Sequence, residues 1–240
     1  MGAVYSPELD NIKIFISPSR AISRMKTVVN RDGKVAAIRE DAHKPVREAW
    51  SAAVFLLGYS QITNHQYWLR ENPVKNEAPD IFSISILPPF QDEKGVKREI
   101  LEIEVCDYDE HCKLDLVDHI KEKLGGKAYN PFTLLLCYVH KQGEARLIDL
   151  INGLKETKTS VREIWILFHP GQDINGEFAI SRVFLRDPGI DVPCHYEGNY
   201  RQLALIPQQE MIKTSRGSGK EINFVPMGIG YVPLPIVKKK

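Results

Sequence analysis

Residues 79–106 read PDIFSISILPPFQDEKGVKREILEIEVC, and this stretch decides the fold of the chain. Its first apolar run, Ile81–Leu87, is bounded by Pro79-Asp80 and by Pro88-Pro89, which is the pattern of a β-strand. A polar link containing Gly95 follows, and Glu99–Cys106 then alternates apolar and polar residues as a half-buried strand does. The stretch therefore predicts a β-hairpin.

The segments that flank this hairpin predict further helices and strands. Apolar residues recur at helical spacing in three segments, and two continuous apolar runs are typical of strands covered on both faces. The predicted helices are His43–Leu57, Lys113–Leu124 and Glu144–Lys155, and the predicted strands are Phe132–Val139 and Glu163–Phe168. Because β-α-β-α-β units follow the hairpin, we predict an α/β fold with a mixed sheet and helices on both sides.

The two ends of the chain differ from this core in composition and pattern. Residues 1–42 contain one short strand candidate, Ile12–Ile16, and otherwise predict an irregular segment. After residue 170, proline and glycine separate three strand candidates: Phe178–Leu185, Gln202–Ile206 and Ile222–Pro233. We therefore predict an N-terminal arm (1–42), an α/β core (43–170) and an irregular, β-leaning C-terminal extension (171–240).

The composition of the 240 residues is that of a globular protein, with 43% hydrophobic and 26% charged residues, which excludes a fibrous or wholly disordered chain. The net charge of +1 excludes a histone-like polycation. The stretch from Glu99 to Asp118 nevertheless contains eight acidic residues and one lysine, a net charge of −7. Such a segment marks either a cation site or a solvated acidic face, and charge alone does not separate the two.

Targeting signals and cysteine spacing indicate the cellular compartment of the protein. The first twenty residues lack the apolar core of a secretory signal, and the uncharged segment Ala49–Leu69 turns polar after Gly58, so that it predicts a buried helix and no membrane span. The four cysteines form no C-x-x-C pair, which disfavours a structural zinc site. These features predict a cytoplasmic protein with reduced cysteines.

Three carboxylates of the hairpin form the candidate site. Asp80 opens the first strand, and Glu102 and Glu104 are two residues apart on the second, so that both of their side chains leave the same face of the sheet. Carboxylates gathered in this way repel one another unless a cation binds, and Mg²⁺ or Mn²⁺ takes such oxygen ligands. The ion can bridge a phosphodiester and activate a water molecule for in-line attack. The alternative interpretation is an amphipathic strand that shows two glutamates to solvent.

The same residues resemble the motifs of the PD-(D/E)xK nuclease superfamily, whose members share the restriction-endonuclease-like fold. Pro79-Asp80 matches motif II, and Glu102 on the next predicted strand matches the acid that begins motif III. Glu48 on the preceding predicted helix matches a further glutamate of that fold, although the helix dipole alone favours an acid in a first turn. The resemblance covers residues 43–169 and implies that Asp80, Glu102 and the backbone carbonyl of Ile103 hold Mg²⁺ or Mn²⁺.

One position departs from the family pattern, because Glu104 stands where the superfamily has a lysine. Some restriction enzymes of the superfamily carry glutamate there, which implies that Glu104 binds a second metal ion or orients or deprotonates the attacking water. Lys113, on the next predicted helix, is the candidate for the missing ammonium group. The same departure is also expected of a catalytically inactive member that binds nucleic acid or a protein.

The resemblance implies a metal-dependent nuclease, with DNA as the expected substrate. Residues 215–220 read SRGSGK, which lacks the full phosphate-binding-loop pattern and predicts a flexible basic loop in which Arg216 and Lys220 contact phosphates. An enzyme that cuts both strands of a duplex is expected to form a homodimer, because two-fold DNA sites match two-fold proteins.

Overall fold

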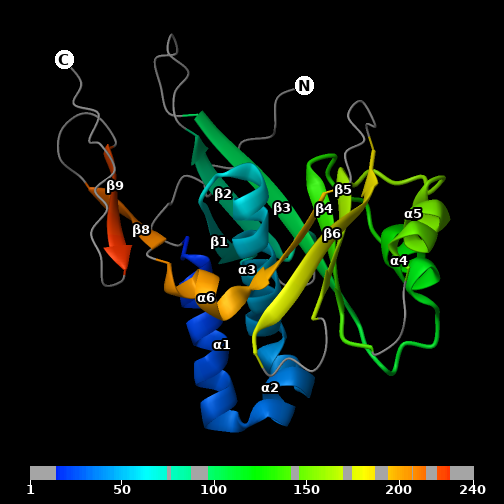
Figure 1. The fold of residues 1–240 in the computed structure, drawn as a ribbon, viewed down its shortest axis with the longest axis horizontal. Helices are drawn as coiled ribbons and strands as arrows, with labels where there is room; N and C mark the ends of the chain where they lie inside the picture. Colours follow the sequence, from blue (N-terminus) through cyan, green and yellow to red (C-terminus); the bar gives the residue numbers. More distant parts are fainter. Residues whose placement is uncertain are drawn as a thin grey trace.

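The computed structural model describes residues 15–74, 77–85, 99–141, 146–169, 175–186 and 194–206, and the backbone of 86–87, 97–98, 208–214 and 221–227. Its centre is a mixed, strongly curled sheet of seven strands with helices on both faces, which confirms the predicted α/β class (Figure 1). The strands follow one another across the sheet in chain order: β1 (Tyr67–Glu71), β2 (Ile81–Leu87), β3 (Lys97–Tyr108), β4 (Thr133–Val139), β5 (Glu163–Phe168), β6 (Glu177–Leu185) and β7 (His195–Asn199).

The pairing of β3 changes along its length. β1, β2 and β3 are antiparallel, β3, β4 and β5 are parallel, and β6 and β7 are again antiparallel to their neighbours. Residues 97–103 of β3 pair with β2, whereas residues 102–108 pair with β4. The middle of β3 is therefore the point at which its pairing with β2 ends and its pairing with β4 begins.

Helices cover the two faces of the sheet unequally. The long helix α3 packs against one face together with α1, α2 and α6, and α4 and α5 cover the other (Figure 1). Alternation along β3 sends Ile103 and Val105 into the core on the α3 side and Cys106 into the core on the α4 side. The helices are α1 (Pro18–Asp32), α2 (Lys34–Arg39), α3 (Lys44–Thr63), α4 (Leu116–Gly125), α5 (Leu147–Leu154) and α6 (Tyr200–Leu205), with a 3-10 turn at Asp41–His43.

Helix α4 begins later than the sequence pattern predicts. Oδ1 of Asp115 accepts a hydrogen bond from the N–H of Asp118 at 2.9 Å, and this cap makes Leu116 the first helical residue. Lys113 therefore lies in the turn before the helix, where it is exposed.

Residues 18–39 are helical, where the sequence predicts an irregular arm. Oγ of Ser17 accepts the N–H of Arg20 at 3.3 Å, and Pro18 occupies the first turn of α1. Of the predicted strand Ile12–Ile16, residues 12–14 lie outside the described residues, and Ile16 forms an isolated β-bridge with Leu69. The N-terminal segment is thus tied to both α3 and the edge strand β1.

Two other segments differ from their predicted structures. Strand β1 (Tyr67–Glu71) is not predicted from the sequence. Gln202–Ile206, predicted as a strand, is largely the helix α6, because Oδ1 of Asn199 accepts the N–H groups of Arg201 and Gln202 and caps it. The remaining predicted helices and strands of the core are confirmed, with ends that shift by a few residues at most sites and with α3 extended to Thr63.

The C-terminal part contributes to two sheets. β6 and β7 extend the large sheet beyond residue 170, and β8 (Gln208–Thr214) pairs with β9 (Glu221–Met227) in a separate antiparallel ribbon. The predicted strand Ile222–Pro233 overlaps β9, and its last residues lie outside the described part. None of the helices in the described ranges has the length and hydrophobicity needed to cross a membrane.

Candidate active site

The register of the β2–β3 hairpin places Asp80 opposite Glu104. Ile81 pairs with Ile103, and one antiparallel step further outward brings Asp80 and Glu104 together. Oδ2 of Asp80 accepts a hydrogen bond from the N–H of Val105 at 2.8 Å, which fixes this carboxylate against β3 just beyond the last β2 pair. Burial and, next, the charge of Glu104 raise the pKa of Asp80 above its usual value.

Glu104 is fully buried and is paired with lysines from the end of α4. Its Oε1 lies 2.9 Å from Nζ of Lys123 and 2.7 Å from Nζ of Lys127. Its Oε2 is buried and has no hydrogen-bond partner among the described residues. A buried carboxylate is tolerated only with such charge compensation, so the two ammonium groups explain how Glu104 can occupy the interior.

Lys123 is the more enclosed of the two lysines. Its side chain is 26% exposed against 36% for Lys127, and it also donates a hydrogen bond to the carbonyl of Val105 at 3.2 Å. Burial lowers the pKa of Lys123, but the charge of Glu104, the hydrogen bond to it and the charge of Asp80 together raise the pKa above the usual lysine value. This lysine is therefore charged throughout the physiological range of pH.

Glu102 makes a different set of contacts. It stands opposite Phe82 on β2 and beside Thr133 on β4. Its two carboxylate oxygens accept hydrogen bonds from Nδ2 of Asn130 at 3.1 Å and from Oγ1 of Thr133 at 3.0 Å. Burial raises the pKa of Glu102, and these two donors act in the opposite direction. The structure thus pairs Asp80 with Glu104 and ties Glu102 to the start of β4.

Glu48 approaches the same pair from α3. Its side chain is 12% exposed, and its Oε1 lies 3.5 Å from Nζ of Lys44 one turn earlier. Burial, followed by the charges of Asp80 and then, more weakly, Asp107, raises the pKa of Glu48 to about 7. Among the acids predicted for the site, Asp80 is the one whose charge acts on Glu48.

The raised pKa of Glu48 predicts a pH-dependent stability. The folded-state pKa of about 7 exceeds the ordinary value of 4.5, so the stabilisation is complete below about pH 4.5 and is lost as the pH rises through 7. Since Lys44 and solvent still reach the carboxyl group, we expect a loss of about 1–2 kcal/mol between pH 5 and pH 8. Urea unfolding in EDTA at both pH values measures it. Glu48→Gln should flatten this difference, and an unchanged difference in the variant would assign it to other groups.

The other residues predicted for the site lie outside the pair formed by Asp80 and Glu104. Lys113 is exposed before α4, and Lys123, ten residues further, supplies the ammonium group that contacts Glu104. Ile103 is fully buried on β3 between the two glutamates. Arg216 and Lys220 lie outside the described residues. Among the residues that are described, no three His, Cys, Asp or Glu side chains are grouped so as to hold a metal ion.

Lys123 was missed although its position carries a signal. Leu116, Ile120 and Leu124 form the inward stripe of α4, and Lys123 falls on this stripe at seven residues from Leu116. A lysine on a core-facing stripe needs a buried acid as its partner. The position of Lys123 on this stripe therefore indicates a buried acidic partner, which is Glu104.

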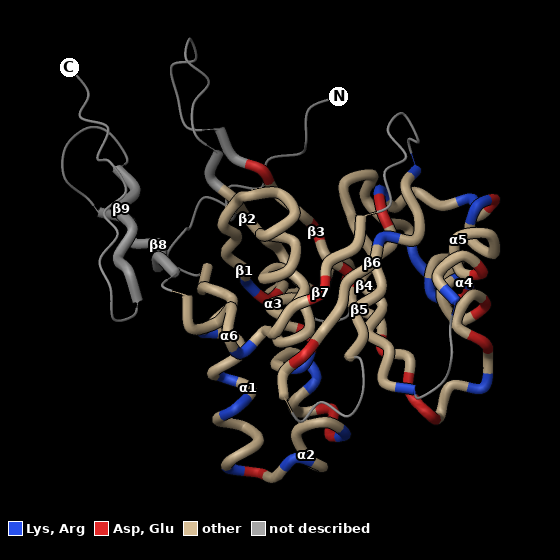
Figure 2. The backbone as a smooth tube through the Cα atoms, viewed as in Figure 1, with Lys and Arg blue, Asp and Glu red and all other residues tan. Residues whose placement is uncertain are grey.

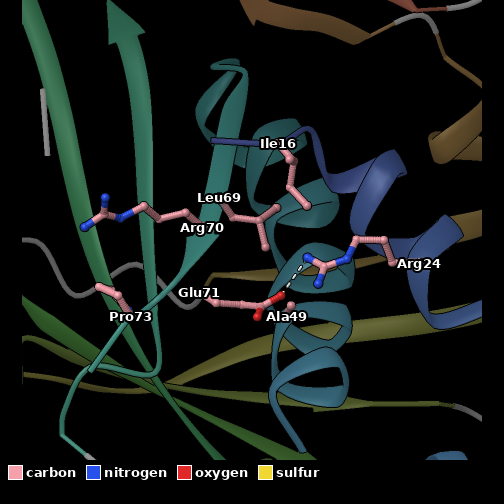
Figure 3. A pocket seen from close by; sticks show the side chains of 7 residues that line it. All are labelled: Ile16, Arg24, Ala49, Leu69, Arg70, Glu71 and Pro73. Atoms are coloured by element: carbon pink, nitrogen blue, oxygen red, sulfur yellow. Dashed lines mark hydrogen bonds and ion pairs between the residues drawn. The ribbon is translucent and has the colours of Figure 1, made fainter. Parts of the chain in front are cut away.

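A cavity of about 230 Å³ lies between α1, α3 and β1 (Figure 3). Figure 3 shows Arg24 and Glu71 facing each other across it, with Nη1 of Arg24 2.6 Å from Oε1 of Glu71. The next residue, Asn72, donates its N–H to the carbonyl of Asp80 at 2.9 Å. The cavity is thus connected to the acid cluster through the end of β1.

The chain matches no model of a protein family and no curated protein sequence.

Proposed function

We propose that this chain is a Mg²⁺-dependent nuclease with a restriction-endonuclease-like core, and that it hydrolyses phosphodiester bonds of DNA. The observation that carries the proposal is the pair Asp80–Glu104, held across β2 and β3 where the two strands separate. It is supported by Glu48 on one side of this pair and by Lys123 on the other. The proposal keeps Asp80 from the sequence resemblance and moves the role of the second acid from Glu102 to Glu104.

The donor set fits a hard divalent cation. Among the described residues, Oε2 of Glu104 is a buried carboxylate oxygen without a hydrogen-bond partner. Asp80 adds a second carboxylate, whose pKa is raised by burial and, next, by the charge of Glu104. Mg²⁺ is commonly held by one or two carboxylates and several water molecules, so a third acid is not required. When bound, the ion would supply Lewis acidity and an activated water molecule.

The lysine of the family pattern has a counterpart here once Glu104 is taken as the motif acid. Cys106 then occupies the lysine position of the strand, two residues later on the same face, and it is buried. Nζ of Lys123 lies next to Glu104 and can stabilise the negative charge that develops on a phosphate in the transition state. In this proposal an ammonium group from α4 replaces the one missing from β3.

Glu48 is suited to accept a proton in this arrangement. A general base works best when its pKa is close to the operating pH, and burial brings the pKa of Glu48 to about 7. The influence of Asp80 on this pKa supports a role for Glu48 beside the acid pair. Glu102 then acts as a positioning residue that holds the start of β4 through Asn130 and Thr133.

A non-catalytic binding module is the second candidate, and one observation favours it. Both ammonium groups contact the same oxygen of Glu104, so the charge of this carboxylate is already balanced without a cation. A member that has lost its metal would retain such a pairing for stability alone.

Cleavage of DNA tests the proposal directly. We expect the wild-type protein to nick supercoiled plasmid in Mg²⁺ or Mn²⁺, to be inactive in EDTA, and to bind Mn²⁺ in calorimetry. Single-stranded DNA assayed in parallel defines the substrate. If neither plasmid nor single strands are cut and no Mn²⁺ binds, the catalytic function is wrong and the binding module remains.

A further inference from the structure

The first two helices carry a surface with a strong excess of positive charge. Between residues 18 and 39 there are six basic residues and one acidic residue, Asp32, which gives a net charge of +5 in a chain of net charge +1. Figure 2 shows basic positions recurring along α1 and α2. The basic residues define what we call the α1–α2 surface, and all six are exposed: Arg20, Arg24, Lys26, Arg31, Lys34 and Arg39.

Helical spacing aligns the arginines of α1. Arg20, Arg24 and Arg31 are separated by four and seven residues, which places them along one line on the exposed side of the helix. Another side of α1 packs into the protein, with Pro18 and Ala21 buried, and α1 lies against α3. The orientation of the cations toward solvent is therefore set by the core of the protein.

Contacts connect this surface to the proposed active site. Arg24 pairs with Glu71, and the neighbouring Asn72 is hydrogen-bonded to Asp80. At the far end of the surface, Nε2 of His43 lies 3.2 Å from Oδ2 of Asp32, one residue before α3 begins. The surface therefore lies next to the end of β1, which is hydrogen-bonded to the backbone of Asp80.

The chemistry of the surface favours a duplex. Residues 18–39 include no aromatic side chain, so they offer no ring on which an unpaired base could stack. A duplex instead presents about one negative charge per 1.7 Å of its axis, and arginine and lysine bind it through its phosphates.

We infer that the α1–α2 surface binds the phosphate backbone of double-stranded DNA and directs the duplex to the site at Asp80 and Glu104. The inference rests on the proposed function, which makes DNA the substrate, and it assigns the binding of that substrate to residues outside the predicted core. Binding through phosphates does not depend on base sequence, so the surface contributes affinity without specificity.

Three cations of the surface allow a test that leaves the fold intact. In the described part of the chain, the side chains of Arg20, Lys26 and Lys34 make no hydrogen bond or ion pair. The test variant carries Arg20→Gln, Lys26→Gln and Lys34→Gln. The matched control removes three exposed lysines beside α4 and α5, on the other side of the sheet, as Lys121→Gln, Lys155→Gln and Lys158→Gln. Circular dichroism and thermal melting check that both are folded.

Binding is measured by fluorescence anisotropy in EDTA, where no cleavage occurs, with a labelled DNA duplex and a single strand of the same length. We expect the test variant to bind the duplex about 10-fold or more weakly at 0.1 M salt, and the slope of log K against log salt to fall by about 3. The control should bind the duplex like the wild type.

The outcomes separate this inference from the proposed function. Three outcomes would overturn the assignment of DNA binding to the α1–α2 surface, even if the wild type cuts plasmid. The test variant could bind the duplex as tightly as the wild type, the control could lose as much affinity as the test variant, or the wild type could fail to bind the duplex. A larger loss for the single strand than for the duplex would overturn the choice of partner. A wild type that binds duplex through these cations and fails to cut would instead support the surface and reject the nuclease.

Discussion

Glu104→Gln is expected to lower Mg²⁺-dependent DNA cleavage by about 10³-fold or more, whereas Glu102→Gln should lower it by less than about 10-fold. The difference follows from placement, because Glu104 stands opposite Asp80 and has a free buried oxygen, while both oxygens of Glu102 are held by Asn130 and Thr133. Rates of plasmid nicking at saturating Mg²⁺ measure both effects.

The two variants control for each other. Each replaces one carboxylate of β3 with an amide of the same shape, and the positions are two residues apart on the same face. Calorimetry with Mn²⁺ adds a readout that does not require turnover, and binding should be lost only in Glu104→Gln. A greater loss in Glu102→Gln would return the metal site to the acid that the sequence resemblance favours.

Lys123→Met is expected to destabilise the protein by about 3 kcal/mol, because it leaves the fully buried carboxylate of Glu104 with one ammonium group in place of two. Lys127→Met should cost about 1 kcal/mol, since the side chain of Lys127 is more exposed and its partner keeps the contact to Lys123. Urea unfolding in EDTA at pH 7 gives both values.

The double variant Lys123→Met with Glu104→Gln identifies the cause. Without a buried charge at Glu104 there is nothing for Lys123 to compensate, so the double variant should regain most of the stability that Lys123→Met loses. If the losses of the two single variants simply add, the contribution of Lys123 comes from its packing and not from the ion pair.

Short-range patterns predict the hairpin, because the alternation of apolar and polar residues and the bounding prolines are visible within a few neighbouring residues. They were not enough to predict which glutamate faces Asp80. The spacing of Glu102 and Glu104 places both on one face, but the register between β2 and β3 decides which of them meets Asp80. That register depends on pairing between strands, which no local pattern states.

The N-terminal helices and Lys123 were missed for related reasons. In α1 the charged residues outnumber the strongly apolar ones, so the sequence shows no clear apolar stripe. Ser17 and Pro18, which begin the helix, are then its main helix signals. In α4 the predicted start at Lys113 differs from the observed start at Leu116, and the inward stripe passes through Lys123, which contacts Glu104. In both segments the difference concerns where a helix begins, and this is decided by a single capping contact.

The acid pair and the connection between β2 and β3 lie at opposite ends of the hairpin. The acid pair lies at its open end, and seven register pairs lie between that end and the connection from β2 to β3, a distance of roughly 23 Å at 3.3 Å per residue. Insertions and deletions in that connection can therefore accumulate without displacing Asp80 or Glu104.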